Sequence, residues 1–146
     1  MGLGPEPLDE QEFDSHYLFQ VSRGRNVPLK SFIMDQKIVV GVGNIYASEA
    51  LFRAKVHPLI PAGSLKLRQA DTLVNSIRDV LLDSIAFGGT TISDFRQAGG
   101  SQGYFQNQLF VYGDEGSPCV YCDHPIASTV LAGRSTYWCS KCQKKG

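Results

Sequence analysis

The sequence lacks any long apolar run, and it has few cysteines: four in 146 residues. Its apolar runs are only a handful of residues long, as at residues 38–40, so none is expected to span a membrane. Its acidic N-terminus has no positively charged start followed by an apolar stretch, so no secretory signal is visible. We therefore expect a soluble, intracellular protein, in which thiols stay reduced and grouped cysteines usually bind a metal.

Neither sign of charge is in excess, because 14 Lys and Arg balance 14 Asp and Glu. This balance argues weakly against a nucleic-acid partner, but the charges are unevenly placed. Five acids and no bases lie in the first 14 residues, which leaves 14 bases against nine acids from Ser15 onward, or +5. That asymmetry permits an anionic partner, although ordinary solvated charge explains it about equally well.

Apolar residues make up 42% of the chain, enough for the core of one compact domain with a small appendage. A linker rich in Gly and Pro is expected at residues 1–8 and a helical domain at residues 9–96. Four helices are predicted in this domain: from an N-cap at Asp9 to about Val21, from Pro28 to Met34, from an N-cap at Asn44 to about Ala54, and from Ser64 to Gly88-Gly89. The apolar face of the fourth is formed by Leu73, Ile77, Leu81 and Ile85, widened by Val74 and Leu82.

The C-terminal part of the chain has a different character. Residues 97–112 form a polar, glycine-rich loop and its connector, of the kind that can move. Residues 113–146 hold all four cysteines and two short strand-like runs, Ser128–Leu131 and Ser135–Trp138, joined by Ala132-Gly133-Arg134. The predicted fold class is therefore mainly α, with a small metal-bound β-hairpin after the helices.

The cysteines have the spacing of a tetrahedral zinc site. Two Cys-x2-Cys pairs are separated by sixteen residues, and their members are Cys119, Cys122, Cys139 and Cys142. Four thiolates leave no open position for water, so the one expected Zn²⁺ is structural and supplies most of the folding free energy of this short segment. A role for His124 as a competing ligand and pairing of the cysteines as disulfides remain as alternatives.

A second pattern is the short loop Gly41-Val42-Gly43-Asn44 before a predicted helix. Two glycines let the backbone approach a ligand closely, and the helix start offers free N–H groups and a positive dipole end. The Asn44 amide can also donate a hydrogen bond to a phosphate oxygen. Taken alone, the loop is explained more simply by a plain helix N-cap after a turn.

Several stretches occur together in one order: LGPEPL (3–8), MDQKIVVGVGNIYASEALF (34–52), GGTTISDF (88–95), GYFQNQLFVYG (103–113) and the cysteine hairpin. Over essentially its whole length, the chain resembles the C-terminal half of the formamidopyrimidine-DNA glycosylases, and less closely the endonuclease VIII-type enzymes. The resemblance implies a helix–two-turn–helix domain followed by a zinc finger. It also implies a double-stranded DNA partner that contains an abasic site or a damaged base, flipped out of the duplex.

The resemblance assigns roles to individual residues. Asn44, which follows Gly43, matches an asparagine that contacts phosphate at the lesion. Arg134, in LAGRSTYWC, matches the arginine at the tip of the zinc-finger hairpin, which contacts flanking phosphates and acts in the late elimination step of the full-length enzymes. Arg25 matches a basic DNA-contacting position at which Lys is expected, and Lys30 is a weaker candidate of the same kind. The loop 97–108 matches the segment that closes over the flipped base, where Tyr104 and Phe105 are expected to pack rather than stack on it.

One departure limits the activity that the resemblance implies. These enzymes hydrolyse the N-glycosidic bond of oxidised purines and then cleave the strand by β,δ-elimination, starting from an N-terminal proline amine in a β-sandwich domain. Here Met1 is followed by Gly2, while Pro5 lies inside LGPEPL and has no free amine. We therefore expect part of a longer gene product that binds DNA without catalysis, in bacterial cytoplasm and on the nucleoid.

Two other interpretations stay open. The chain could be a stand-alone, non-catalytic zinc module that binds DNA or protein. Alternatively, a separate chain could carry the missing N-terminal domain and assemble with this one.

Overall fold

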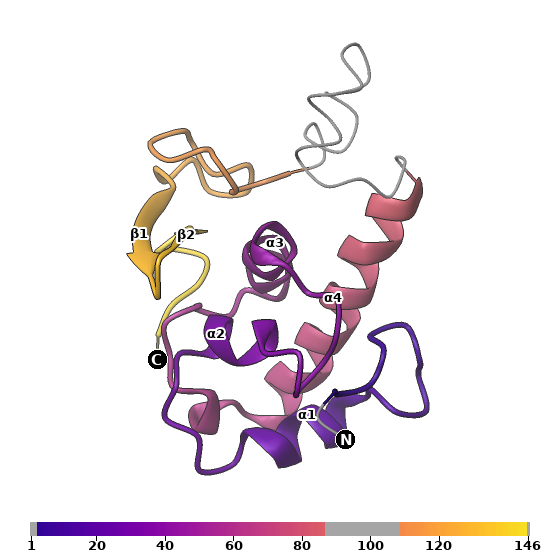
Figure 1. Cartoon of the computed structure of the whole chain (residues 1–146). Coiled ribbons are helices and arrows are strands. Elements are labelled where there is room, and N and C mark those ends of the chain that lie inside the picture. The colour runs from indigo at the N-terminus through magenta and orange to yellow at the C-terminus, as the bar shows by residue number, and fades with distance from the viewer. Residues whose placement is uncertain (1–2, 87–108, 146) are drawn as a thin grey trace.

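The computed structural model describes residues 3–86 and 109–145. The predicted helix end at Gly88-Gly89 and the loop at 97–108, with Tyr104 and Phe105, lie outside the described residues. Within the described ranges the chain is mainly helical and ends in a two-stranded antiparallel hairpin, which confirms the predicted fold class (Figure 1). No helix in these ranges combines the length and apolarity needed to cross a membrane.

The first helix, α1, spans Ser15–Ser22 and not the predicted range from Asp9. Asp14 is its N-cap, with an extended backbone and a side chain that accepts a hydrogen bond from the Tyr17 amide at 2.8 Å. Asp9 does accept the amides of Gln11 and Glu12, but it closes a separate turn that the chain leaves before α1 begins. Asp9 and Asp14 both suit an N-cap by residue type, so this rule alone does not distinguish them, and the predicted N-cap Asp9 is wrong.

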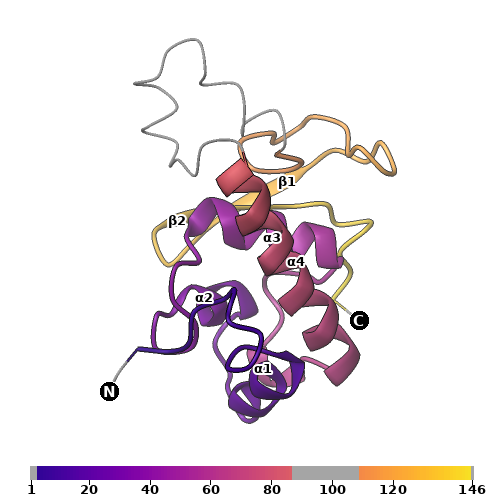
Figure 2. The same ribbon diagram turned by 90° about the vertical axis from the view of Figure 1, so that its right-hand side faces the viewer.

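Three further helices and one short turn of 3₁₀-helix complete the helical body. Helix α2 spans Leu29–Met34, α3 spans Asn44–Ala54, and α4 spans Leu67–Ala86 after the 3₁₀ turn η1 at Ala62–Ser64, so the fourth helix begins after the predicted Ser64. The four helices bury one shared core, whose larger members include Leu18, Leu29, Phe32, Ile33, Leu51, Leu73 and Ile77. Helix α3 lies at the centre of the molecule, between α4 and the hairpin (Figures 1 and 2).

The predicted apolar face of α4 is only partly buried. Leu73 and Ile77 are buried, but Ile85 is 59% exposed and Leu82 is 51% exposed. Residues spaced strictly by four drift around an α-helix by about 40° at each step, so Ile85 lies about 120° away from Leu73. The buried side follows a spacing of four and then three, and Val80, which the prediction missed, is fully buried.

The hairpin consists of β1 (Ala127–Leu131) and β2 (Arg134–Trp138). Leu131 pairs directly with Arg134, so the turn has only two central residues, Ala132 and Gly133. Both have positive φ, 51° and 78°, as a type I′ turn requires. Arg134 is therefore the first residue of β2, one position beyond the turn in which the sequence placed it.

The hairpin and its connector pack on α3 through a second, smaller core. Phe52 of α3 is fully buried against Val111, Ile126, Cys119 and Cys139, and the Tyr121 ring stacks on it at 5.5 Å between centroids. Gln143 adds a hydrogen bond from its side-chain amide to the Val56 carbonyl at 3.0 Å. The cysteine segment is thus fixed against the N-terminal helices at α3.

Candidate metal centre and nucleic-acid interface

The four predicted metal ligands converge at one point. All four Sγ atoms lie within 4.8 Å of one another, with Cys119 and Cys142 3.8 Å apart and Cys122 and Cys139 3.5 Å apart. Zn–S bonds of about 2.3 Å in tetrahedral geometry place sulfurs about 3.8 Å apart. These separations match a zinc site and are far longer than the 2.05 Å or so of a disulfide bond, which removes the disulfide alternative.

The chemistry of the cluster also fits a divalent cation. Burial and the three neighbouring thiols raise the pKa of Cys142 to about 12, and a cation bound among the sulfurs would favour its ionised form. His124 is exposed and lies outside the cluster of sulfurs, so it does not compete as a ligand. The four cysteines are therefore placed to hold one Zn²⁺ in a closed, structural site.

Asn44 lies where α3 meets the hairpin. The N-cap of α3 is Gly43 and not Asn44 as predicted, so the Asn44 side chain is released from capping and reaches across to β2. Its Nδ2 donates to the Ser135 carbonyl at 3.0 Å, and its Oδ1 accepts from the ammonium of Lys30. The amide is thereby fixed in one orientation, with its donor side toward the hairpin.

Lys30 is buried, with 1% of its surface exposed. Its Nζ donates to Asn44 Oδ1, to Thr136 Oγ1 at 2.9 Å and to the Ser135 carbonyl at 3.4 Å. Burial, and secondarily the charge of Arg134, lower the pKa of Lys30 to about 8. The side chain connects α2, α3 and β2, so its place in the fold is that of a brace below the surface.

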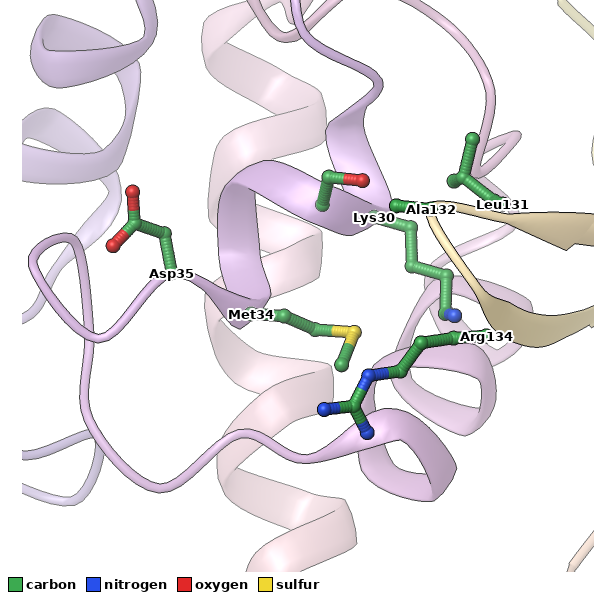
Figure 3. Close-up of a pocket in the computed structure, with 7 residues that line it drawn as sticks. Lys30, Met34, Asp35, Leu131, Ala132 and Arg134 are labelled. Atoms are coloured by element: carbon green, nitrogen blue, oxygen red, sulfur yellow. The ribbon is translucent and has the colours of Figure 1, made fainter.

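Arg134 is exposed at the start of β2. With Lys30, Met34 and Leu131 it lines a cavity of about 220 Å³ between α2 and the hairpin turn. Figure 3 shows the Arg134 side chain running past the Lys30 ammonium, with its guanidinium beside Met34, while Asp35 lies on the far side of Met34. The wall formed by Lys30 and Arg134 therefore carries two positive charges that come from different parts of the sequence.

Arg25 is the other predicted DNA contact. It is exposed, in the turn between α1 and α2, with its guanidinium 5.2 Å from the centre of the Phe32 ring. The close backbone packing of this turn on η1 fixes its path, because a Cβ at Gly63 would lie 2.9 Å from the Arg25 carbonyl oxygen. The structure thus presents Arg25 beside α2, the helix that carries Lys30.

Sequence reasoning missed Glu49, which is fully buried in α3. Its carboxylate accepts three consecutive backbone amides of the connector to the zinc finger: Phe110 at 2.6 Å, Val111 at 2.9 Å and Tyr112 at 2.7 Å. Burial raises the pKa of Glu49, and the three amides and Arg53 oppose that rise. The one available signal was an isolated acid among the mostly apolar residues 47–52 of a helix.

The comparisons with known proteins agree with this geometry. The family model for the formamidopyrimidine-DNA glycosylase H2TH domain matches residues 3–96, and the model for the zinc finger found in FPG and IleRS matches residues 116–145. The formamidopyrimidine-DNA glycosylase of Bdellovibrio bacteriovorus is 55% identical over 142 residues, which are 97% of this chain and 52% of that protein. That of Haemophilus influenzae is 50% identical over 144 residues, which are 99% of this chain and 53% of that protein.

Solved structures of formamidopyrimidine-DNA glycosylases are also similar to this chain. The crystal structure of the MutM (Fpg) protein from Thermus thermophilus superposes with a TM-score of 0.85 at 41% identity, covering 99% of this chain and 55% of that one. The Lactococcus lactis enzyme, non-covalently bound to DNA with an AP site, superposes with a TM-score of 0.86 at 35% identity. The superposition covers 99% of this chain and 51% of that one. The chain spans about half the length of the curated relatives it matches. It belongs to the formamidopyrimidine-DNA glycosylase family, of which it carries the H2TH domain and the zinc finger.

Proposed function

We propose that this chain is the half of a base-excision DNA glycosylase and AP lyase that grips duplex DNA at a damaged or abasic site. The observation that carries the proposal is the convergence of Asn44 of α3 and Arg134 of β2 beside the cavity that Lys30 and Arg134 line. The solved relatives that it resembles include one bound to DNA with an AP site and one bound to DNA with FAPY-dG. Asn44, Gly43, Arg25 and Arg134 would contact phosphates, with Lys30 behind them.

The start of α3 supports a phosphate contact. The N-cap residue of α3 is Gly43, so no side chain accepts a hydrogen bond from the first amides of the helix. The space beside Gly43 is open, because a Cβ there would meet nothing within 4 Å. The first amides of this 11-residue helix therefore lack a capping side chain, at the positive end of its dipole. The Asn44 amide lies one residue further on and can exchange the Ser135 carbonyl for a phosphate oxygen. Arg134 supplies the planar fork that suits two phosphate oxygens.

We propose that the chain by itself does not cleave DNA. The family resemblance places the nucleophile on an N-terminal proline amine, whereas the Pro5 nitrogen is part of a peptide bond and its carbonyl accepts the Val40 amide at 3.1 Å. Incubation with duplex containing an abasic site and borohydride is expected to leave no covalent adduct. A trapped adduct would show that another amine of this chain performs the reaction, against the proposal.

A specific surface favours a catalytic domain as the missing partner. A second cavity, of about 270 Å³, is lined mainly by residues of the N-terminal segment, the glycine loop and α4, among them Pro7, Leu8, Val40, Gly41, Tyr46, Leu81 and Ile85. Leu8 and Ile85 remain 41% and 59% exposed. We propose that an N-terminal domain, on the same or a separate chain, covers this face, and that the enzyme acts on oxidised purines of bacterial nucleoid DNA in the cytoplasm.

The division of the chain is proposed accordingly. Residues 9–96 form the helical DNA-binding part after a linker at 1–8, residues 97–112 form the lesion-capping loop and connector, and residues 113–146 form the zinc finger. A stand-alone zinc module that binds protein is the second candidate, for which Val120 and Tyr121, 60% and 62% exposed at the first Cys-x2-Cys turn, offer an apolar surface.

Fluorescence anisotropy of zinc-loaded chain on labelled duplexes tests the DNA-binding function. One duplex carries a tetrahydrofuran abasic-site analogue and the other is intact. The expected result is tighter binding to the abasic duplex and an affinity that falls steeply with salt, because phosphate contacts release counterions. Equal, weak and salt-insensitive binding to both duplexes would favour the protein-binding module instead.

A further inference from the structure

Lys30 is a buried cation whose partners are all neutral. In the part of the chain that the structure describes, its ammonium has three oxygen partners, on Asn44, Ser135 and Thr136, and no ion pair. Three N–H donors meet three acceptors, so the protonated form satisfies the whole cluster. A neutral amine has only two N–H groups, so it can keep at most two of these three hydrogen bonds. The three hydrogen bonds favour the protonated amine of Lys30, while no described carboxylate pairs with it.

The charged groups around this cluster are also unbalanced. Arg134 of β2 adds a second positive charge and is one of the two causes that lower the pKa of Lys30, to about 8. On the α2 side, Asp35 lines the same cavity but lies across Met34 from the ammonium (Figure 3). The connector contributes the Tyr112 phenol, which lies beside Asn44. Within residues 3–86 and 109–145, no carboxylate pairs with Lys30, which leaves room for an anion from outside the chain.

We propose that a DNA phosphate is that anion and that DNA binding draws a proton onto Lys30, so that Lys30 makes binding dependent on pH although it does not contact DNA itself. This inference rests on the proposed function. The ammonium is a positioning group: when protonated it holds Asn44 Oδ1 and the start of β2 together, which presents the Asn44 amide and Arg134 to the same strand. A phosphate near Arg134 and Asn44 offsets the two positive charges and restores the ordinary preference of lysine for its charged form.

The size of the effect follows from linkage. A free-protein pKa of about 8 leaves Lys30 almost fully protonated at pH 7 and about one-tenth protonated at pH 9. If bound phosphate returns the pKa to the ordinary value near 10.4, affinity at pH 9 is about tenfold lower than at pH 7. At pH 8.5 the chain takes up roughly 0.7 proton for each duplex bound.

The test compares zinc-loaded wild-type chain with Lys30→Arg, whose charge does not titrate in this range, and Lys30→Met, which has no charge. Affinity for a duplex with a tetrahydrofuran site is measured from pH 6.5 to 9.5 at fixed salt. Calorimetry at pH 8.5, in two buffers of different ionisation enthalpy, counts the protons taken up. The N-terminal amine is the same in all three proteins, so its contribution to the pH dependence of binding cancels in the comparison.

Wild type is expected to lose affinity above pH 8 and to take up protons, whereas Lys30→Arg binds with no such dependence and Lys30→Met binds weakly at every pH. Binding by wild type with no proton uptake, or the same pH profile in Lys30→Arg, overturns the inference and leaves the proposed function intact. Failure of wild type to bind at any pH contradicts the proposed function itself. If neither variant folds, as judged by zinc content and circular dichroism, the titration of ¹³C-lysine-labelled wild type with and without DNA decides the question: an unchanged Lys30 pKa overturns the inference.

Discussion

Glu49 anchors the zinc finger to α3, and replacing it by Gln weakens that anchor with little change of shape. The carboxylate accepts one amide at Oε1 and two at Oε2. In Glu49→Gln the amide oxygen can keep the two bonds to Val111 and Tyr112, but the new NH₂ group then faces the Phe110 N–H. One partly buried donor, the Phe110 N–H, loses its acceptor, which costs about 1–3 kcal/mol, and two bonds to a charged acceptor become bonds to a neutral one.

Together these losses amount to about 3 kcal/mol of unfolding free energy. Urea unfolding of the zinc-loaded chain, with a slope of about 2 kcal/mol per molar, then shifts its midpoint down by about 1.5 M. The matched control is Glu115→Gln, an exposed acid in the zinc finger, for which no shift is expected. A Glu49→Gln midpoint within about 0.3 M of wild type would refute the anchoring role.

Three other predictions concern zinc, packing and pH. Cys139→Ala removes one of four thiolate ligands, so zinc measured by atomic emission is expected to fall from one ion per chain to near zero; retention of a full ion contradicts the four-sulfur site. Gly4→Ala places a Cβ 2.3 Å from the Ile38 carbonyl oxygen and is expected to lower thermal stability by about 1–3 kcal/mol, whereas Gly43→Ala, which meets nothing within 4 Å, has only the smaller cost of alanine at a helix N-cap. Burial, then the charge of Lys145, hold the pKa of His57 below 6.5; the unfolded chain therefore binds more protons, and stability is expected to fall between pH 7 and 5.5 by more in wild type than in His57→Gln.

The features that the sequence predicted correctly depend on local patterns. The spacing of the four cysteines predicts the metal site without reference to the rest of the chain, and the short strand-like runs on both sides of Ala132-Gly133 predict the hairpin. Most helices were also placed within a few residues of their observed bounds. The errors lie at helix starts: Asp9 and Asp14, or Gly43 and Asn44, satisfy the same local rule, and packing of the whole domain selects between them.

The features that the sequence did not predict depend on contacts across long sequence separations. The sequence predicts Lys30 only as a weaker candidate for a DNA contact, but its ammonium donates a hydrogen bond to Thr136, 106 positions away along the chain. Glu49 meets the connector amides 61–63 positions away. No periodicity or motif reports such pairs, because each depends on how the zinc finger docks on α3. The role of Lys30 as a brace could be proposed only once that docking was known.

The central claim is that α3 and the zinc-finger hairpin present one phosphate-binding surface. The most direct test is the affinity of Arg134→Ala for the abasic duplex at fixed salt, beside Arg68→Ala, another exposed arginine on the first turn of α4. We predict that Arg134→Ala loses about 1.5–3 kcal/mol of binding, with its zinc content unchanged and its salt slope reduced by about one, while Arg68→Ala binds like wild type. Equal affinity of the two variants would contradict the claim.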